Sequence, residues 1–383
     1  NRAMHGCPND DSRLAPILHT AELRAVESRH AGSQLMERAG KAAAAVAHAM
    51  LADSRGGPIV VLAGPGNNGG DGFVVARELR RAFHDVDVVF RGDPSTLPAD
   101  ARAAHAAFVA AGGSTMREPR KLAPALVVDA LFGIGLSRPL PPEAASLVTW
   151  SNATGAPTLA LDIPTGLHAD TGIATAPAIR ATATATFIAL KPGLLTAEGP
   201  DFCGEVTVHS LGLAPDAAAA ATGRALDWTT LSSDLPEVFA RRVRAVHKGT
   251  FGTLGIVGGA TGMTGAPLLA GRAALRTGAG KVWVGFAAAN PPAVDGGMPE
   301  LMLRNAEDVL EATASAYVVG CGLGTDARAH DLLARALARP VAIVLDADAL
   351  TLLGGDPALR AAARARNAAT LVTPHPAEAG RLL

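Results

Sequence analysis

The sequence has few cysteines and few aromatic residues. Its 383 residues include three cysteines, Cys7, Cys203 and Cys321, and this odd, widely spaced set forms neither a disulfide framework nor a metal-ligand cluster. Aromatic residues make up 4% of the chain, which argues against a surface on which nucleic-acid bases stack. We therefore expect a protein of the reducing cytoplasm that has no nucleic acid as partner.

The sequence also lacks an excess of charge of either sign, and it has no long apolar run. The 34 basic and 35 acidic residues balance, so nothing in the charge suggests nucleic acid or an anionic membrane as partner. The alanine-rich run 41–51 is too short to span a bilayer, and residues 1–13 contain no signal-peptide core. We expect no membrane partner.

What the chain does contain is a regular alternation of strand-like and helix-like runs. Near-continuous apolar strands are expected at 58–63, 86–90, 125–129, 157–161, 183–190 and 204–209, and again at 253–257, 281–286, 316–319, 341–345 and 370–373. Strands of this kind, alternating with helices, form parallel sheets covered on both faces. The sequence thus predicts an α/β chain of two domains, 1–223 and 224–383, with the boundary near Gly223 in a stretch without clear periodicity.

A glycine-rich segment, GPGNNGGDG at 64–72, stands between the first strand and a helical pattern. This order predicts a turn whose backbone N–H groups converge on an anion at a helix N-terminus. Its two asparagines and one aspartate add side-chain oxygens, which could also hold a hard cation. The alternative is an ordinary tight turn rich in Asn and Gly.

Polar residues stand at the ends of the following strands. Asp93, Asp129, Asp162 and Lys191 end the second to the fifth strand. Because ligands of open α/β sheets bind at the carboxyl ends of the strands, we expect these residues to converge with the glycine-rich segment. Any one of the aspartates could instead cap a helix, and Lys191 could lie at the surface with its charge in water.

Four segments resemble the NAD(P)H-hydrate epimerase domain. They are NNGGDG at 67–72, VDALFGIGL at 128–136, LDIPTGL at 161–167 and ALKPGL at 189–194. The resemblance covers roughly residues 18–212 and implies a Rossmann-like three-layer α/β/α fold. It also implies interconversion of the R and S epimers of hydrated NADH and NADPH, in which water has added to the nicotinamide ring.

The resemblance implies the residues of this site as well. Substrate is expected to contact Asn67, Asn68, Gly69, Gly70, Asp71, Gly133, Ile134, Gly135, Leu136, Ser137, Arg138, Pro139 and Asp162. A potassium ion is expected on Asn68, Asp129 and Thr165, which all offer oxygens. Asp162 is the candidate acid/base, with a helix cap or a ribose partner as alternative roles, and Lys191 is the second catalytic candidate, able to screen phosphate charge.

A second set of motifs resembles the ADP/ATP-dependent NAD(P)H-hydrate dehydratase, a member of the ribokinase-like superfamily. The motifs are HKGTFG at 247–252, GG at 258–259, GAG at 278–280, GCGLG at 320–324, DADAL at 346–350 and TPHPAE at 373–378. The resemblance implies that ADP or ATP, with Mg²⁺, phosphorylates the ring hydroxyl of the S form, after which phosphate is eliminated. It implies substrate contacts at Ala266, Gly324 and His375.

One departure concerns the end of the chain. The dehydratase family carries a Gly-x-Gly-Asp stretch with its catalytic base after these motifs, and none follows His375 before Leu383. We therefore expect the second domain to be C-terminally incomplete in this sequence, and a chain ending at Leu383 to epimerise hydrates without dehydrating them.

Two other functions fit parts of the sequence. The second domain alone could belong to a small-molecule or vitamin kinase of the ribokinase-like superfamily, which leaves the segment 67–72 unexplained. A non-enzymatic nucleotide-binding module could keep the fold without activity, although Asp129, Asp162 and Lys191 are all present. A homo-oligomer is expected in the leading interpretation.

Overall fold

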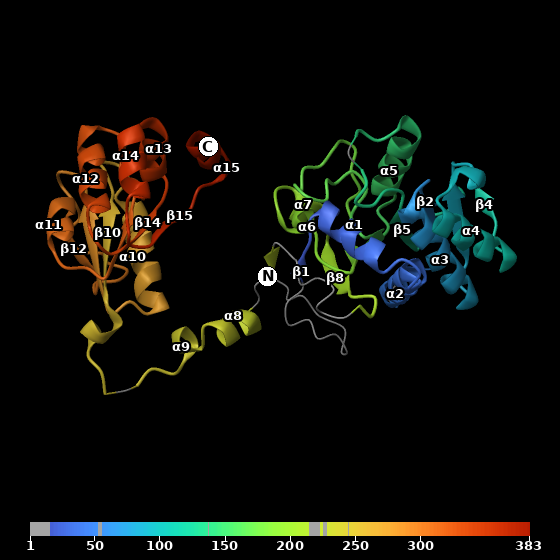
Figure 1. Cartoon of the computed structure of the whole chain (residues 1–383), viewed down its shortest axis with the longest axis horizontal. Coiled ribbons are helices and arrows are strands. Elements are labelled where there is room, and N and C mark those ends of the chain that lie inside the picture. Colours follow the sequence, from blue (N-terminus) through green and yellow to red (C-terminus); the bar gives the residue numbers. More distant parts are fainter. Residues whose placement is uncertain (1–15, 53–55, 137, 214–222, 225–227, 244) are drawn as a thin grey trace. The chain divides into compact units, whose positions relative to one another are not determined.

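The computed structural model describes residues 16–52, 56–136, 138–213, 223–224, 228–243 and 245–383. They form two compact units, which divide between Ala240 and Arg241 (Figure 1). In the first unit, strand β9 (Gly223–Arg224) pairs antiparallel with β1 (Pro16–Ile17). The short helices α8 (Trp228–Asp234) and α9 (Pro236–Phe239) follow before the second unit begins. The boundary near Gly223 stays a prediction.

The first unit is built on a seven-stranded parallel sheet in the order β4-β3-β2-β5-β6-β7-β8. Its strands are β2 (Ile59–Ala63), β3 (Val86–Phe90), β4 (Thr115–Met116), β5 (Leu126–Ala130), β6 (Thr158–Leu161), β7 (Ala183–Phe187) and β8 (Glu205–His209). Each of β2, β3, β5 and β6 is buried along its whole length, which explains the continuous apolar runs. The edge strand β4 was not expected, because two residues are too short to form such a run.

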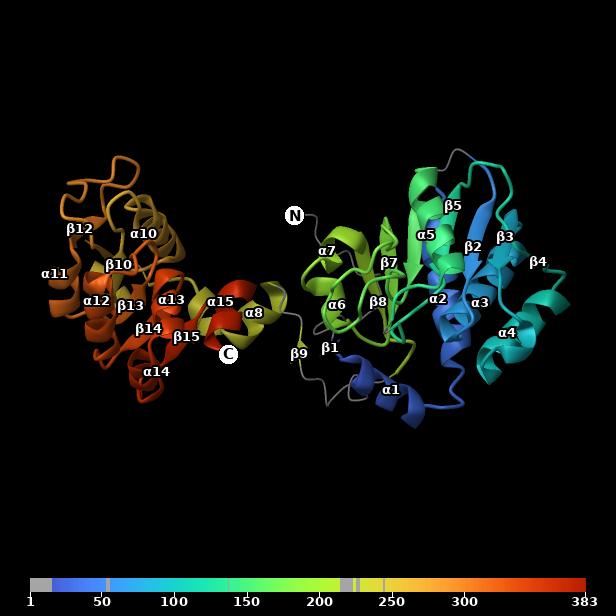
Figure 2. The ribbon, with the colours of Figure 1, turned by 90° about the horizontal axis from the view of Figure 1, so that it is seen from above.

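Helices cover both faces of this sheet (Figure 2). They are α1 (Thr20–Arg29), α2 (Leu35–Met50), α3 (Asn67–Arg81), α4 (Ala99–Ala110), α5 (Pro142–Thr154), the short α6 (Pro192–Leu195) and α7 (Gly199–Phe202), and the 3-10 turn η1 (Pro94–Thr96). Val61 and Val128 face a core that includes Phe73 of α3. Their neighbours Leu62 and Val127 face the opposite core, with helix α5. Adjacent strand residues therefore serve different faces, as the pleat requires.

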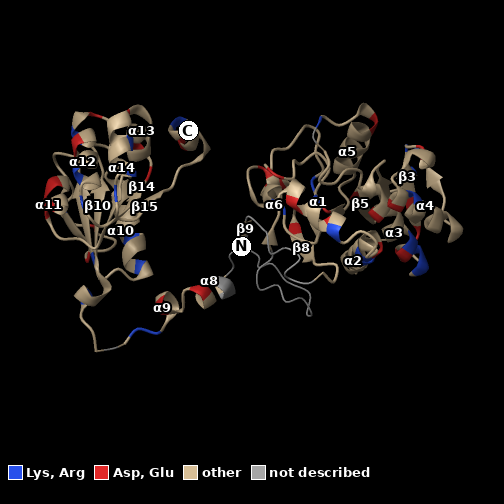
Figure 3. Cartoon of the chain, viewed as in Figure 1, with Lys and Arg blue, Asp and Glu red and all other residues tan. Residues whose placement is uncertain are grey.

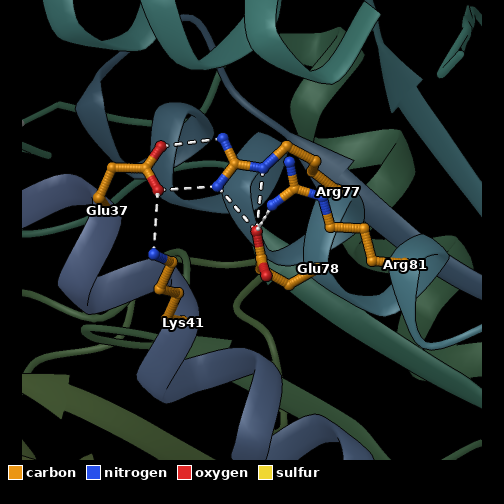
Figure 4. Close-up of polar contacts among 5 residues, drawn as sticks. All are labelled: Glu37, Lys41, Arg77, Glu78 and Arg81. Carbon is orange, nitrogen blue, oxygen red and sulfur yellow. Dashed lines mark hydrogen bonds and ion pairs between the residues drawn. The ribbon is translucent and has the colours of Figure 1, made fainter. Parts of the chain in front are cut away.

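Arg77 ties α3 to α2 (Figure 4). Its side chain is 7% exposed, and its Nη1 and Nη2 donate to the two carboxylate oxygens of Glu37 at 2.9 and 2.7 Å. Glu78 accepts from Nε and Nη2 of the same guanidinium. The hydrogen bonds from Arg77 lower the pKa of Glu37. This bidentate pair holds α3 in place, so the N-terminus of that helix has a defined position relative to the sheet.

The second unit repeats the architecture with six parallel strands in the order β12-β11-β10-β13-β14-β15. Its strands are β10 (Thr253–Gly258), β11 (Lys281–Phe286), β12 (Met302–Asn305), β13 (Ala316–Val319), β14 (Ala342–Leu345) and β15 (Thr370–Val372). The half-polar edge strand β12 was not expected. The two parallel sheets with their helices confirm the α/β class.

The helices of the second unit also lie on both faces. They are the 3-10 turn η3 (Lys248–Phe251) and the helices α10 (Gly265–Thr277), α11 (Ala306–Glu311), α12 (Ala327–Leu337), α13 (Asp348–Gly355), α14 (Pro357–Arg364) and α15 (Pro376–Leu382). Side chains of α10 pack with Ile256 and Val284 on one face. Helices α11 to α14 pack with Val257 and Leu345 on the other.

Basic and acidic residues are interspersed along the ribbon of both units (Figure 3). Within the part of the chain that the structure describes, no helix has the length and apolarity needed to cross a membrane.

Candidate functional site

The strand order of the first sheet places a crevice at the ends of β2 and β5. The chain builds β2, β3 and β4 toward one edge, then returns to add β5, β6, β7 and β8 on the other side of β2. Ligands of open α/β sheets bind at such a reversal point, outside the carboxyl ends of the strands. The glycine-rich segment follows β2 and the segment 131–139 follows β5, so both flank this crevice.

The sequence suggested a turn for the glycine-rich segment, but most of this segment is helical in the structure. Helix α3 begins at Asn67, with Gly66 as its extended N-cap residue, so Asn67, Asn68, Gly69, Gly70 and Asp71 form its first turns. The helix begins early because the glycines let it pack against the strand ends. A Cβ on Gly64 would lie 1.6 Å from the carbonyl oxygen of Leu131, and one on Gly69 would lie 2.0 Å from that of Gly64. The place where the sequence predicts an anion is therefore a helix N-terminus packed against the reversal point.

The three residues expected to hold a cation come from α3, β5 and the segment after β6. Asp129 is 0% exposed, and its carboxylate accepts hydrogen bonds from the N–H of Thr165 at 2.8 Å, the hydroxyl of Thr165 at 2.7 Å and the N–H of Leu131 at 3.2 Å. Burial raises the pKa of Asp129 to about 6, against the lowering effect of these hydrogen bonds. Asn68 is 9% exposed, and among the described residues its Nδ2 has no hydrogen-bond partner.

This donor set fits a hard monovalent cation. The carboxamide of Asn68, the carboxylate of Asp129 and the hydroxyl of Thr165 supply oxygens, which such an ion prefers. The unpartnered atom of Asn68 is Nδ2, a hydrogen-bond donor, so it offers a site for an acceptor and not a ligand for the cation. The structure thus brings Asp129 and Thr165 into direct contact and leaves Asn68 unsatisfied.

Asp162 and Lys191 form an ion pair at the neighbouring strand ends. Lys191 is 0% exposed and Asp162 keeps 14% of its side chain exposed. The ammonium contacts the Asp162 carboxylate and donates to Thr186 Oγ1 at 2.7 Å and to the carbonyl oxygen of Phe187 at 2.9 Å. The surface location considered for Lys191 is therefore wrong. Its charge is covered from solvent by the protein, whereas Asp162 is the member of the pair that solvent reaches.

The backbone of Asp162 lies in the left-handed region, with φ of 68°. A non-glycine residue rarely adopts this conformation, which costs on the order of 1–2 kcal/mol. Strand neighbours hold it there, since its N–H donates to the carbonyl oxygen of Ala185 at 2.8 Å. Strain of this kind, next to a buried ion pair, is typical of functional positions.

Two further carboxyl groups act on this pair. Burial raises the pKa of Asp71 well above its ordinary 3.8, and the charges of Asp162 and Glu27 raise it further. Glu27 lies on the exposed side of α1, yet partial desolvation of its carboxyl, followed by the charge of Asp162, raises its pKa too. Lys191 opposes both shifts. The charge of the buried ammonium thus acts on three carboxyl groups, of which Asp162 is the one that contacts it among the described residues.

The segment after β5 forms the opposite wall of the crevice. A Cβ on Gly133 would lie 3.4 Å from the side chain of Asn68, and one on Gly135 would lie 3.4 Å from Arg24 of α1. Ile134 packs against the core beneath. A cavity of about 120 Å³ opens beside this segment, lined by Leu136, Arg138, Pro139, Gly166, His168 and Thr175. Of the expected substrate contacts here, Ser137 lies outside the described residues.

Asp93 does not belong to the group of strand-end residues that converge at this site. Its carboxylate accepts from the N–H of Ser95 at 2.8 Å and caps η1. The alternative role of a strand-end aspartate as a helix cap therefore holds for this residue.

The second unit has a comparable reversal point between β10 and β13. The N–H of Ala260 donates to the carbonyl oxygen of Gly322 at 2.7 Å. A Cβ on Gly322 would lie 3.4 Å from Ala266. The N–H of Gly324 donates to Asp348 at 2.8 Å. Ala266 and Gly324 are therefore both at the reversal point of this sheet.

His375 caps a helix in this fold. It is the N-cap residue of α15, where its Nδ1 accepts from the N–H of Ala377 at 3.2 Å. Its Nε2 lies 3.1 Å from Glu378, and the imidazole is exposed. Nearby, Thr373 donates to Asp346 at 2.7 Å, which links the ends of β14 and β15. Whether His375 also contacts substrate stays a prediction.

Some residues of the site had no signal in the sequence. Glu27 belongs to a helix that precedes the sheet, so no strand end pointed to it. Thr186 lies inside an apolar strand, where a threonine is common. His168 and Thr175 line the cavity from a segment without regular structure.

Family models match both units. Residues 32–193 match the model described as YjeF-related protein N-terminus, and residues 254–383 match the one described as NAD(P)H-hydrate dehydratase. The bifunctional NAD(P)H-hydrate repair enzyme Nnr of Coxiella burnetii is 38% identical over 371 residues, which cover 94% of this chain and 73% of that protein. The Escherichia coli K12 enzyme of the same name is 39% identical over 360 residues, covering 91% and 67%.

Solved structures match less extensively. The crystal structure of yeast ynu0 has a TM-score of 0.46 and 20% identity, and covers 55% of this chain and 96% of that one. An ADP/ATP-dependent NAD(P)H-hydrate dehydratase from Bacillus subtilis, co-crystallised with ATP and Mg²⁺, has a TM-score of 0.30 and 28% identity, covering 37% and 50%. From the sequence relatives and the two matched units, the chain belongs to the family of bifunctional NAD(P)H-hydrate repair enzymes.

Proposed function

We propose that the first unit interconverts the R and S epimers of hydrated NADH and NADPH, and that the second returns the S form to NADH or NADPH with ADP or ATP. Membership of the repair-enzyme family supports both activities. The observation that carries the first is the solvent-facing Asp162, paired with buried Lys191 beside the N-terminus of α3. No specific observation favours a vitamin kinase or a non-enzymatic module. A homo-oligomer and a cytoplasmic location stay predictions.

Binding of the dinucleotide begins at the N-terminus of α3. The first N–H groups of a helix have no partner within it, and the helix dipole places partial positive charge there. The pyrophosphate therefore accepts hydrogen bonds from the first turn, residues 67–69. The glycine-rich wall at 133–135 allows close approach, and Leu136, Arg138 and Pro139 extend the contact along the cavity. This arrangement directs the hydrated ring toward Asp162.

The chemistry needs one proton acceptor and one proton donor. The epimers differ at the carbon that bears the added hydroxyl and is also bonded to the ring nitrogen. When the hydroxyl loses its proton, this carbon–nitrogen bond breaks, the hydroxyl becomes a carbonyl, and the nitrogen takes up a proton. Closing the bond on the other face of the carbonyl gives the other epimer. Asp162, whose charge Lys191 balances, accepts a proton from the substrate. Asp71, whose pKa is raised, donates one. Carboxyl groups whose environments differ in this way suit opposite roles, and the return step restores both groups to their starting states.

Potassium, held by Asn68, Asp129 and Thr165, would supply positive charge near the substrate phosphates. We expect potassium to lower the Kd of the hydrate by about tenfold. Mutation of a single group around a metal site changes metal affinity or activity by a similar factor. Asp129→Ala should remove this dependence, because the ion loses its one anionic ligand. Isothermal titration with hydrate in potassium chloride and in tetramethylammonium chloride measures both quantities.

The control for this prediction is Asp93→Ala. It removes a strand-end carboxylate that caps η1 and lies outside the site, so its potassium dependence should equal that of the wild type. If Asp129→Ala binds hydrate as tightly as wild type in potassium, the cation site is wrongly assigned.

The second unit takes ADP or ATP, with Mg²⁺, in this proposal. Ala266 and Gly324 at its reversal point would contact the hydrate, and His375 would add a polar contact. The described residues contain no group of three or more His, Cys, Asp or Glu side chains placed to hold a metal ion. Mg²⁺ would instead arrive with the phosphates of the nucleotide.

A mixture of R and S hydrates of NADH, followed by chromatography with and without ADP or ATP, tests the proposal. Without nucleotide, the epimers should reach their equilibrium ratio faster than in buffer. An unchanged rate in the presence of the chain would overturn the epimerase assignment. Nucleotide-dependent return of NADH absorbance would support the second activity, and its absence would count against it.

A further inference from the structure

Thr186 lies directly behind the Asp162–Lys191 pair. It is 0% exposed, in strand β7, and its Oγ1 accepts from the Lys191 ammonium at 2.7 Å. The carbonyl oxygen of Phe187 accepts a second hydrogen bond at 2.9 Å, and the Asp162 carboxylate takes the third. An ammonium group has three N–H donors. Thr186 thus completes the set of acceptors that makes a buried charge tolerable here.

The chain makes a sharp reversal to allow this contact. Strand β7 ends at Phe187, and Ile188 follows with φ of 67°. The carbonyl oxygen of Leu190 then accepts from the N–H of Leu18 at 2.9 Å, and its N–H donates to the carbonyl oxygen of Pro16 at 2.9 Å. These bonds hold the backbone just before Lys191, so its side chain returns alongside the end of β7.

We propose that Thr186 is a positioning residue of the epimerase reaction, which holds the Lys191 ammonium against the Asp162 carboxylate. The inference rests on the proposed role of Asp162 as proton acceptor. The Thr186 hydroxyl also lies 3.5 Å from Asp162 Oδ1, so one group touches both members of the pair. Thr186 itself does not reach the substrate, because both its burial and the ion pair separate it from the crevice.

The Thr186 hydroxyl matters because other charged groups also act on Lys191. Glu27 from α1 and Asp71 from α3 also act on Lys191, and Arg24 acts on Glu27. Without the Thr186 acceptor, the ammonium has one N–H left without a partner and is held less firmly against the Asp162 carboxylate.

The test compares three variants of the whole chain. Thr186→Val keeps the shape and removes the hydroxyl, and its kcat for epimerisation should fall about tenfold, as expected for a lost hydrogen bond to a charged group, with KM little changed. Thr186→Ser restores the hydroxyl and should restore kcat. Thr184→Val is the matched control, since Thr184 is also in β7 and 0% exposed, but its hydroxyl donates to the carbonyl oxygen of Cys203 at 2.7 Å.

A second measurement does not depend on activity. Nuclear magnetic resonance of the lysine Nζ groups reports how fast the Lys191 ammonium protons exchange with water, and Thr186→Val should accelerate this exchange while Thr184→Val does not. If the valine variant fails to fold, Thr186→Ala provides the same comparison without the branched side chain. Equal kcat values for Thr186→Val and wild type, or equal losses in Thr186→Val and Thr184→Val, would overturn the proposal. If the wild-type chain does not epimerise hydrates, the proposed function is overturned instead. The exchange measurement would then still show whether Thr186 holds the Lys191 ammonium.

Discussion

Asp162→Asn is expected to abolish interconversion of the hydrate epimers, lowering kcat/KM by on the order of 10²–10⁴. The amide cannot accept the proton that the carboxylate takes from the substrate. The loss should appear in kcat more than in KM, because the pyrophosphate contacts at the N-terminus of α3 remain. Single-turnover chromatography of a pure epimer measures the effect.

The same change should also lower stability. It leaves the ammonium of Lys191 buried without its counter-charge, which costs about 3–5 kcal/mol when one partner of a buried pair is removed. A lost activity could then reflect partial unfolding. The double variant Asp162→Asn with Lys191→Met removes both charges and should regain much of the stability while staying inactive.

Urea unfolding, read separately for each unit by hydrogen exchange, measures this recovery. If the double variant interconverts the epimers near the wild-type rate, neither residue is part of the proton transfer. A single variant with full activity would exclude Asp162 alone as the acceptor.

Asp71→Asn is expected to lower kcat by about two orders of magnitude, the usual size of a lost proton donor. The variant should also lose one limb of the pH–rate profile. A donor works in its protonated form, and the pKa of Asp71 lies well above 3.8. Wild-type kcat should therefore fall as the pH rises through that raised pKa. An asparagine does not titrate, so this fall should be absent in the variant.

Glu27→Gln is the control for Asp71→Asn. Glu27 shares the raised pKa and the same neighbours, but it lies on the exposed side of α1. Its removal should lower the pKa of Asp71 and move the limb to lower pH, while the limb itself persists. If Glu27→Gln deletes the limb and Asp71→Asn keeps it, Glu27 is the donor.

A stability measurement checks the same pKa independently. The folded state binds the Asp71 proton more tightly than the unfolded chain does, so the free energy of unfolding falls as the pH rises from 3.8 to the raised pKa. Asp71→Asn should remove this part of the pH dependence. An unchanged dependence would show that Asp71 is ionised in the folded protein at these pH values.

The strands that are buried on both faces could be predicted from the amino-acid sequence. Strand β2, for example, is a continuous apolar run because a parallel sheet under two helical layers has no solvent-facing side. The edge strands β4 and β12 could not be predicted in this way. They are short or half polar, and only pairing with a neighbour makes them strands.

The sequence also placed Asp129, Asp162 and Lys191 at strand ends, because parallel strands bring their carboxyl ends to one edge. It could not show that Lys191 is buried. Its side chain returns alongside β7 only because the backbone reverses at Ile188 and is held by β1, a segment more than 170 residues away in the chain.

The carboxyl groups that act on the Asp162–Lys191 pair could be found only from the folded structure. Glu27 and Asp71 acquire raised pKa values from burial and from charges that lie on other elements, and no local pattern records such distances. The glycine-rich segment became a helix rather than a turn for a similar reason. Its conformation depends on how closely α3 approaches Leu131, and close packing between distant segments is a property of the folded chain, not of the segment.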